Sequence, residues 1–177
     1  MDRNIIFFDV ETNGKIGSSV LSISAIKVNY NFEKNEWTKV SEYNRFYFRN
    51  EGEPIDFGAV NVHGLTDEVI NSKRQGTNYP LTFKEDVDAF FLYCQDTNHF
   101  VAHNIKFDRS FIPFPLKNQF DTMMENIDIV KAGINPNYGT YKWPKLMECA
   151  KFYNVPMNED QLHESLYDVL ILSLIHI

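Results

Sequence analysis

Apolar residues near the start of the chain predict a small antiparallel sheet. Residues 5–9 read IIFFD, and four large apolar side chains in succession are typical of a buried central strand. Apolar and small polar residues alternate over 21–29, and residues 40–48 are rich in aromatic side chains, so each range favours a further strand. Turn signals separate the three ranges at 13–14 and 31–35. We therefore expect a meander of three antiparallel strands.

The pattern changes to helical spacing in the middle of the chain. Thr82 and Glu85 form a capping-box signature at the start of an apolar stripe with helical period. The stripe consists of Phe83, Val87, Phe90, Phe91 and Cys94. A short strand is expected at 100–103, and the helix after it should be cut short by Pro113 and Pro115.

The last third of the chain predicts one more strand and two helices. Residues 126–130 favour a fifth strand, and residues 145–153 favour a helix with Pro144 at its start. A second helix is expected from residue 162 to the end. Strands first, followed by alternating helices and strands, indicate an α/β fold with a mixed five-stranded sheet flanked by helices.

Composition narrows the class of protein. The chain has 177 residues, 44% of them hydrophobic, with 15 Phe and 9 Tyr, so we expect a single globular domain over residues 1–177 and exclude a mainly disordered protein. Cys94 and Cys149 lie in apolar helical patterns, which is typical of core thiols in a reducing compartment. No stretch approaches the roughly 18 apolar residues that cross a membrane, and the start MDRN lacks a signal-peptide core. These features predict a cytoplasmic protein with no membrane contact.

Two acids follow the first predicted strand directly. Positions i and i+2 of a strand share a face, so Asp9 and Glu11 should present two carboxylates side by side. Such acids repel one another unless a cation joins them, and clustered oxygen ligands favour Mg²⁺ or Mn²⁺ over zinc. An isolated Asp-x-Glu pair has a simpler interpretation, in which Asp9 ends the strand and Glu11 is solvated. Whether further acids belong to the same cluster therefore distinguishes the metal-binding interpretation from the simpler one.

Two later segments supply such acids. VAHNIKFD carries His103, Asn104 and Asp108 just after the short fourth strand, and LHESLYD carries His163 and Asp168 in the last helix. Asp168 lies in an apolar stretch, so its carboxylate needs a partner or a metal ion. His163 precedes it by five residues, an offset that suits a base near the metal ions better than a second ligand. Taken alone, His103 and His163 have structural interpretations at the end of a strand and the start of a helix.

In this order, FFDVET, AHNIKFD and HESLYD resemble the three motifs of the DEDDh exonucleases. This is the DnaQ-like family, which includes the proofreading epsilon subunit of bacterial DNA polymerase III. NVHGLTDE is similar to a His-Gly turn found in many members, and KWPKL to a segment of a bacterial and phage branch. The resemblance covers nearly the whole chain. It implies a ribonuclease H-like fold and hydrolysis of single-stranded nucleic acid from the 3′ end, one nucleotide at a time.

The resemblance also implies roles for individual residues. Asp9, Glu11, Asp108 and Asp168 match the four acids that hold two metal ions, Mg²⁺ or Mn²⁺, and His163 matches the general base. Two cations roughly 4 Å apart stabilise the charge that develops on a phosphodiester as water attacks. A neutral imidazole with an ordinary pKa near ~6.5 accepts the proton of that water at neutral pH.

Further residues are candidates for binding the substrate. Residues just past the first acids are suited to hold the terminal sugar or phosphate, or simply to form a turn, and the residue after the Thr-Asn-Gly turn is the nearest candidate for a hydrophobic wedge. The candidate substrate-binding residues are Thr12, Asn13, Ile16, His63, His103 and Asn104. A later segment mixes rings with positive charge, as single-strand binding surfaces do, although loop packing explains it almost as well. Its residues are Tyr138, Tyr141, Lys142, Trp143 and Lys145.

Several alternatives stay open at this point. A net charge of −7 argues against a broad nucleic-acid-binding face, but it is compatible with a nuclease whose acids are neutralised by metal ions. A phosphatase of the Asp-x-Asp-x-Thr type also places acids after a buried strand, although Glu11 replaces the second Asp. A non-catalytic module that docks on a polymerase is a further candidate. Within the exonuclease interpretation, DNA is favoured over RNA, an RNA-processing exoribonuclease is the alternative, and a DNA polymerase subunit is the candidate partner.

Overall fold

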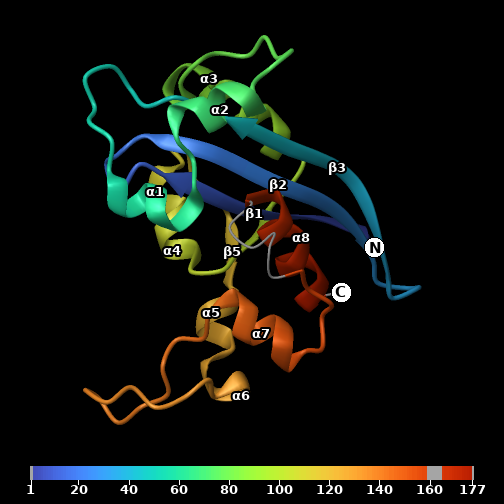
Figure 1. Cartoon of the computed structure of the whole chain (residues 1–177). Coiled ribbons are helices and arrows are strands. Elements are labelled where there is room, and N and C mark those ends of the chain that lie inside the picture. Colours follow the sequence, from blue (N-terminus) through green and yellow to red (C-terminus); the bar gives the residue numbers. More distant parts are fainter. Residues whose placement is uncertain (1, 159–164, 177) are drawn as a thin grey trace.

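The computed structural model describes residues 2–158 and 165–176, which form a mixed sheet covered by helices on both faces (Figure 1). The strands are β1 Asp2–Thr12, β2 Val20–Asn31, β3 Glu36–Phe46, β4 His99–Ala102 and β5 Asn118–Asp121. Their order across the sheet is β3-β2-β1-β4-β5. β1, β2 and β3 pair antiparallel, whereas β4 and β5 add in parallel to β1. The expected mixed five-stranded α/β sheet, antiparallel strands first, is confirmed.

Short helices connect and cover these strands. They are α1 Phe57–His63, α2 Asp67–Lys73, α3 Phe83–Cys94, α4 Ile105–Asp108, α5 Thr122–Glu125, α6 Ile127–Val130, α7 Leu146–Phe152 and α8 Ser165–His176, with a 3₁₀ turn η1 at Arg109–Phe111. The expected capping box begins α3, where the Glu85 carboxylate accepts from the backbone N–H and the hydroxyl of Thr82. No helix of the described residues is long and apolar enough to cross a membrane.

The predicted position of the fifth strand is wrong. Residues 126–130 contain α6, and the strand is β5 at Asn118–Asp121 instead. Asn126 is buried and its side-chain amide donates to the Thr122 carbonyl at 2.7 Å, which continues the turn that α5 begins. β5 is a short edge strand whose sequence NQFD has no apolar alternation, so only its backbone pairing with β4 identifies it.

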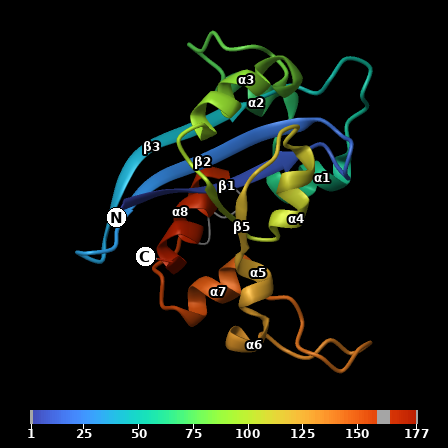
Figure 2. The same ribbon diagram turned by 180° about the vertical axis from the view of Figure 1, so that it is seen from behind.

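Alternate residues of β1 face opposite layers, and this decides where the acids point. Ile6, Phe8 and Val10 join the core that α3 covers. Phe7 points to the other face and packs with Val169 and Leu172 of α8. Asp9 and Glu11 have the parity of Phe7, so they lie on the face that α8 covers. Figure 2 shows the same two layers from behind.

A buried polar network ties β3 to α3. Asp86 is 5% exposed, and its Oδ2 accepts from the Arg45 guanidinium at 2.6 Å and from the Tyr47 hydroxyl at 2.9 Å. The Tyr43 and Tyr47 hydroxyls lie 2.9 Å apart, so both rings share this network. Buried donors that lose their acceptor keep the full cost of their desolvation.

Replacing Asp86 should therefore destabilise the fold. We expect Asp86→Ala to lower the free energy of unfolding by about 2 to 4 kcal/mol, because Arg45 and Tyr47 lose a buried acceptor. Asp88→Ala, an exposed acid on the same helix, is the matched control and should cost under about 0.5 kcal/mol. Urea unfolding of both variants measures the difference. Equal losses would show that the network contributes nothing specific.

Candidate active site

The first three acids meet where β1 ends and α8 crosses it. Asp9 and Glu11 lie in the last part of β1, and Asp168 comes one residue before Val169, which packs on this strand. Burial raises the pKa of Asp9 to about 7, and the charge of Asp168 adds to the rise. Burial likewise raises the pKa of Glu11 to about 9, with contributions from both other carboxylates. Three carboxylates therefore lie close together in one partly buried site.

The fourth acid reaches this place from α4. Asp108 is 3% exposed, and its Oδ1 accepts from the Val10 backbone N–H at 3.0 Å, which fixes it against β1. Burial raises the pKa of Asp108 well above its usual value, and the charges of Asp9 and Glu11 add to this, against the N–H of Val10. Asp9 and Glu11 each interact with the three other acids, so the four carboxylates form one cluster.

The cluster has the chemistry of a site for a divalent cation. Oδ2 of Asp9 is buried and, among the described residues, has no hydrogen-bond partner. Burial and mutual repulsion raise these pKa values. A cation would offset both effects, and clustered carboxylates suit hard cations. Within the same described residues, no three His, Cys, Asp or Glu side chains are arranged as a complete metal site.

The turn after β1 is built by residues that we expected to bind substrate. The Thr12 hydroxyl donates to the Gly14 carbonyl at 2.8 Å. The Asn13 amide donates to Glu53 and to the Pro54 carbonyl, and its backbone N–H donates to Ser19. These polar atoms hold the turn in shape, and contact with a substrate stays a prediction for both residues.

Glu53 is a residue that sequence reasoning missed. Burial alone would raise its pKa, but the backbone and hydroxyl of Ser19 and the amide of Asn13 lower it below the usual value. No motif marks Glu53, because its partners lie about 34 and 40 positions away in sequence. Gly14 is also constrained, since a Cβ there would lie 2.9 Å from Oδ2 of Asp56 at a φ of +148°.

The wedge candidate, Ile16, follows this turn in sequence, and His63 contacts Thr12 at the start of the turn. Ile16 is 69% exposed and lines an open hollow of about 560 Å³ together with Lys15 and Phe57. His63 is buried, its Nδ1 accepts from the Leu65 N–H at 2.9 Å, and its Nε2 lies 3.1 Å from the Thr12 carbonyl. His63 also lines a cavity of about 190 Å³ beside Glu11, which places it next to the acids.

His103 and Asn104 organise the chain around Asp108. Nδ1 of His103 lies 2.9 Å from the Thr122 hydroxyl, and Nε2 lies 2.9 Å from the Pro144 carbonyl. Asn104 begins α4 with φ 70°, and its backbone N–H donates to Asp121 at 3.1 Å. Asp121 also caps α5, a role that an Asp before a short helix could have signalled. These contacts are structural, so a substrate role for His103 and Asn104 stays a prediction.

The family model of the RNase T exonucleases matches residues 6–175, a range that includes all four acids. The chain belongs to this exonuclease family. The resemblance to DnaQ-like exonucleases that three short motifs indicated is thereby confirmed. His163, the predicted base, lies outside the described residues.

Individual relatives agree with membership of the exonuclease family. The chain is 27% identical over 180 residues to a PolC-type DNA polymerase III of Ureaplasma parvum serovar 3, with 95% of this chain aligned and 11% of the polymerase spanned. The structure of exonuclease X in complex with 5′ overhanging duplex DNA matches with a TM-score of 0.63 at 19% identity, covering 97% of this chain and 89% of that one. A zinc-ion-bound E. coli ExoI–ssDNA complex matches with a TM-score of 0.67 at 14% identity, covering 99% and 40%.

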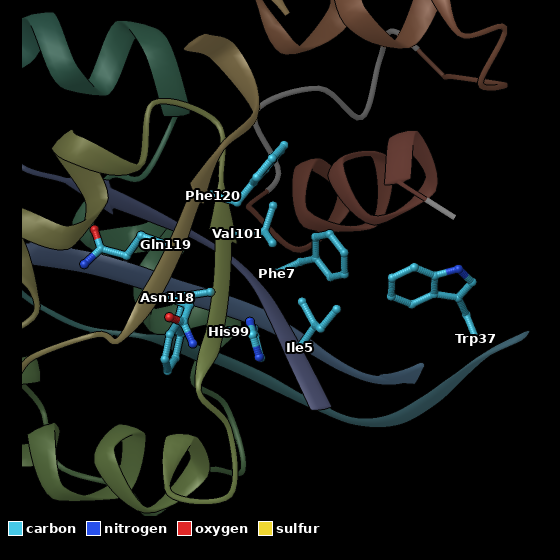
Figure 3. A pocket seen from close by; sticks show the side chains of 9 residues that line it. Ile5, Phe7, Trp37, His99, Val101, Asn118, Gln119 and Phe120 are labelled. Carbon is cyan, nitrogen blue, oxygen red and sulfur yellow. The ribbon is translucent and has the colours of Figure 1, made fainter. Parts of the chain in front are cut away.

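An apolar cavity at the other end of the strands does not belong to this site. Its volume is about 360 Å³, and it is lined by Ile5, His99 and Asn118, which pair near the starts of β1, β4 and β5, together with Phe7 and Trp37 (Figure 3). In open sheets with parallel strands, ligands bind beyond the carboxyl ends. The four acids of this exonuclease domain lie at that carboxyl end of β1.

The pKa values of the acids predict how metal-free stability depends on pH. The folded state holds protons on Asp9 up to about pH 7 and on Glu11 up to about pH 9, whereas carboxyls of the unfolded chain release theirs near pH ~4. Because the pKa values of these carboxyls are higher in the folded state than in the unfolded chain, the free energy of unfolding falls as the pH rises from ~4 to about 7 for Asp9 and to about 9 for Glu11. Asp9→Asn should be more stable than the native chain at pH 8 in chelator and equal to it near pH 4.

Urea unfolding from pH 4 to pH 9 in chelator measures this difference. Saturating Mg²⁺ should stabilise the native chain more at pH 8 than at pH 5, because the cation competes with protons, and should stabilise Asp9→Asn far less. A native chain more stable than Asp9→Asn at pH 8 in chelator would contradict the account.

Proposed function

We propose that this chain is a metal-dependent 3′–5′ exonuclease that hydrolyses phosphodiester bonds of DNA and releases nucleoside monophosphates. The observation that carries the proposal is the cluster of Asp9, Glu11, Asp108 and Asp168, which β1, α4 and α8 bring together in a member of an exonuclease family. Acids with raised pKa values gathered at a strand end are typical of functional sites.

The four acids would hold two Mg²⁺ or Mn²⁺ ions. When bound, such ions stabilise the charge that develops on the entering and leaving oxygens of a phosphodiester. Asp9 would take the shared position, since its Oδ2 is buried and has no hydrogen-bond partner among the described residues. The contact from the Val10 N–H holds Asp108 in place, so the site is partly preorganised. His163 would accept the proton of the attacking water.

A single-stranded DNA 3′ end is the substrate that the comparisons favour. One matched structure is an ExoI–ssDNA complex, which favours a single strand, and another is exonuclease X in complex with 5′ overhanging duplex DNA. The PolC-type relative makes a DNA polymerase subunit the candidate partner. An exoribonuclease of the same family is the alternative. β1 leads directly into antiparallel β2, which disfavours a phosphatase with a helix after its first strand. A cytoplasmic location and a single domain stay predictions.

Degradation of a labelled strand tests direction and metal dependence. A single-stranded DNA labelled at its 5′ end should give a ladder that shortens from the 3′ end in Mg²⁺ or Mn²⁺, and little product in excess chelator. Matched RNA on the same gel reports the sugar preference. Cleavage of a closed single-stranded circle, or full activity in excess chelator, would contradict the proposal.

Two substitutions separate the base from the ligands. His163→Ala should lower turnover by about 10² to 10⁴ while leaving metal affinity nearly intact, because the four acids remain. Asp168→Ala should weaken metal binding and turnover together, since it removes a charge that the cations require. Calorimetric metal titration beside single-turnover kinetics measures both quantities. Equal losses of metal affinity would show that His163 is a ligand.

A further inference from the structure

Residues 131–145, which connect α6 to α7, form an ordered arm. Ile134 and Tyr141 pair in an antiparallel bridge, and the Asn135 N–H donates to the Thr140 carbonyl at 2.8 Å. The Lys142 N–H donates to the Gly133 carbonyl at 2.8 Å, so the two sides are joined along their length. Figures 1 and 2 show the arm projecting away from the sheet. It is a hairpin with a defined shape.

The arm exposes three of its large side chains. Tyr138 at its tip is 77% exposed, Trp143 at its base is 64% exposed and Ile134 is 59% exposed. In the sequence, loop packing explains these residues almost as well as strand binding, but rings that pack a loop are covered by it. Open aromatic faces on a preformed hairpin suit stacking against planar ligands such as nucleobases.

The arm is positively charged in an acidic chain. Residues 131–145 contain Lys131, Lys142 and Lys145 and no Asp or Glu, whereas the whole chain has a net charge of −7. Lys142 pairs with Glu148 at 2.6 Å, which leaves Lys131 and Lys145 as exposed cations. Exposed cations on the same hairpin as exposed rings suit the phosphates and bases of a single strand.

The arm is fixed beside the candidate active site. The carbonyl of Pro144 lies 2.9 Å from Nε2 of His103, and His103 directly follows β4 and precedes α4, which carries Asp108. Nδ1 of the same ring contacts Thr122 after β5, so His103 locks the base of the arm to two strand ends. In both overall views, the arm extends to the side on which α1 and α4 lie (Figures 1 and 2).

We propose that the 131–145 arm binds the single-stranded part of the substrate upstream of its 3′ end. Tyr138 and Trp143 stack on bases, and Lys131 and Lys145 face phosphates. This inference rests on the proposed exonuclease function. Because stacking and phosphate contacts read no base edges, the arm binds strands with little sequence preference.

Binding in the absence of turnover tests the arm directly. The probe is a fluorescein-labelled 20-nucleotide strand of dT, measured by anisotropy with Ca²⁺ in place of Mg²⁺. The double variant Tyr138→Ala, Trp143→Ala should bind roughly tenfold or more weakly, because each lost stack weakens binding severalfold. Phe32→Ala is the control: this ring is 48% exposed, but it lies beside Asn31, which pairs with the start of β1, at the opposite end from Glu11. Unchanged binding of the double variant would overturn the inference.

Two further readouts assign the roles of rings and lysines. Lys131→Gln with Lys145→Gln should reduce the slope of log K against log salt concentration by about 1.4, the value for two phosphate contacts on a single strand. The chain has two Trp, at 37 and 143, so Trp37→Phe leaves Trp143 as its sole Trp, and its emission should be quenched as the strand binds. Unchanged emission during binding would contradict stacking by Trp143.

Activity assays keep this inference separate from the proposed function. In Mg²⁺, the gain in kcat/KM between a dinucleotide and the 20-nucleotide strand should shrink at least roughly tenfold in the double variant. A native chain that degrades no strand would refute the proposed function, while anisotropy would still decide whether the arm binds. A native chain that degrades both substrates, with an arm variant of unchanged length dependence, would refute the arm alone.

Discussion

Repulsion among four carboxylates at the end of β1 is the constraint on which this site depends. Burial of Asp9 and Glu11 already disfavours their charged forms, and Asp168 adds a third negative charge to the same place. A fold would not keep such groups together for stability alone, because apolar residues would pack there without the electrostatic cost. Cation binding by the cluster would explain why the fold keeps these four carboxylates together.

Strand alternation, helix packing and a backbone hydrogen bond bring the four acids together. The alternation of β1 sends Phe7 and the two acids to one face, and the packing of α8 on Phe7 brings Asp168 to them. Asp108 arrives by a different route, since Asn104 turns the chain sharply after β4 and the Val10 N–H holds the carboxylate. The same strand end, through His103, also fixes the base of the 131–145 arm. The carboxyl end of β4 therefore positions both Asp108 of the candidate active site and the base of the arm proposed to bind a strand.

Much of this could be predicted from the sequence, and the misses have physical causes. The IIFFD run identified β1 because its apolar side chains are buried or half-buried, and the alternation over 21–29 identified β2, although its polar members Ser22 and Ser24 are buried as well. β5 was misplaced since NQFD is held by backbone pairing, which leaves no mark on residue type. The acids were found through local motifs, whereas the contacts of Glu53 join residues far apart in sequence. For the arm, composition suggested rings with charge, and only the structure distinguishes exposed rings from packed ones.

Carbon-13 NMR of the aspartate and glutamate carboxyl groups tests the central claim most directly. Titrated without metal, Asp9 should show a midpoint near pH 7 and Glu11 one near pH 9, well above the ordinary carboxyl pKa near pH ~4. Saturating Mg²⁺ should move both midpoints downward by more than about one unit, because cation and protons compete for the same oxygens. Midpoints near pH ~4 for both groups, unaffected by Mg²⁺, would show that the carboxylates neither repel one another nor bind the cation.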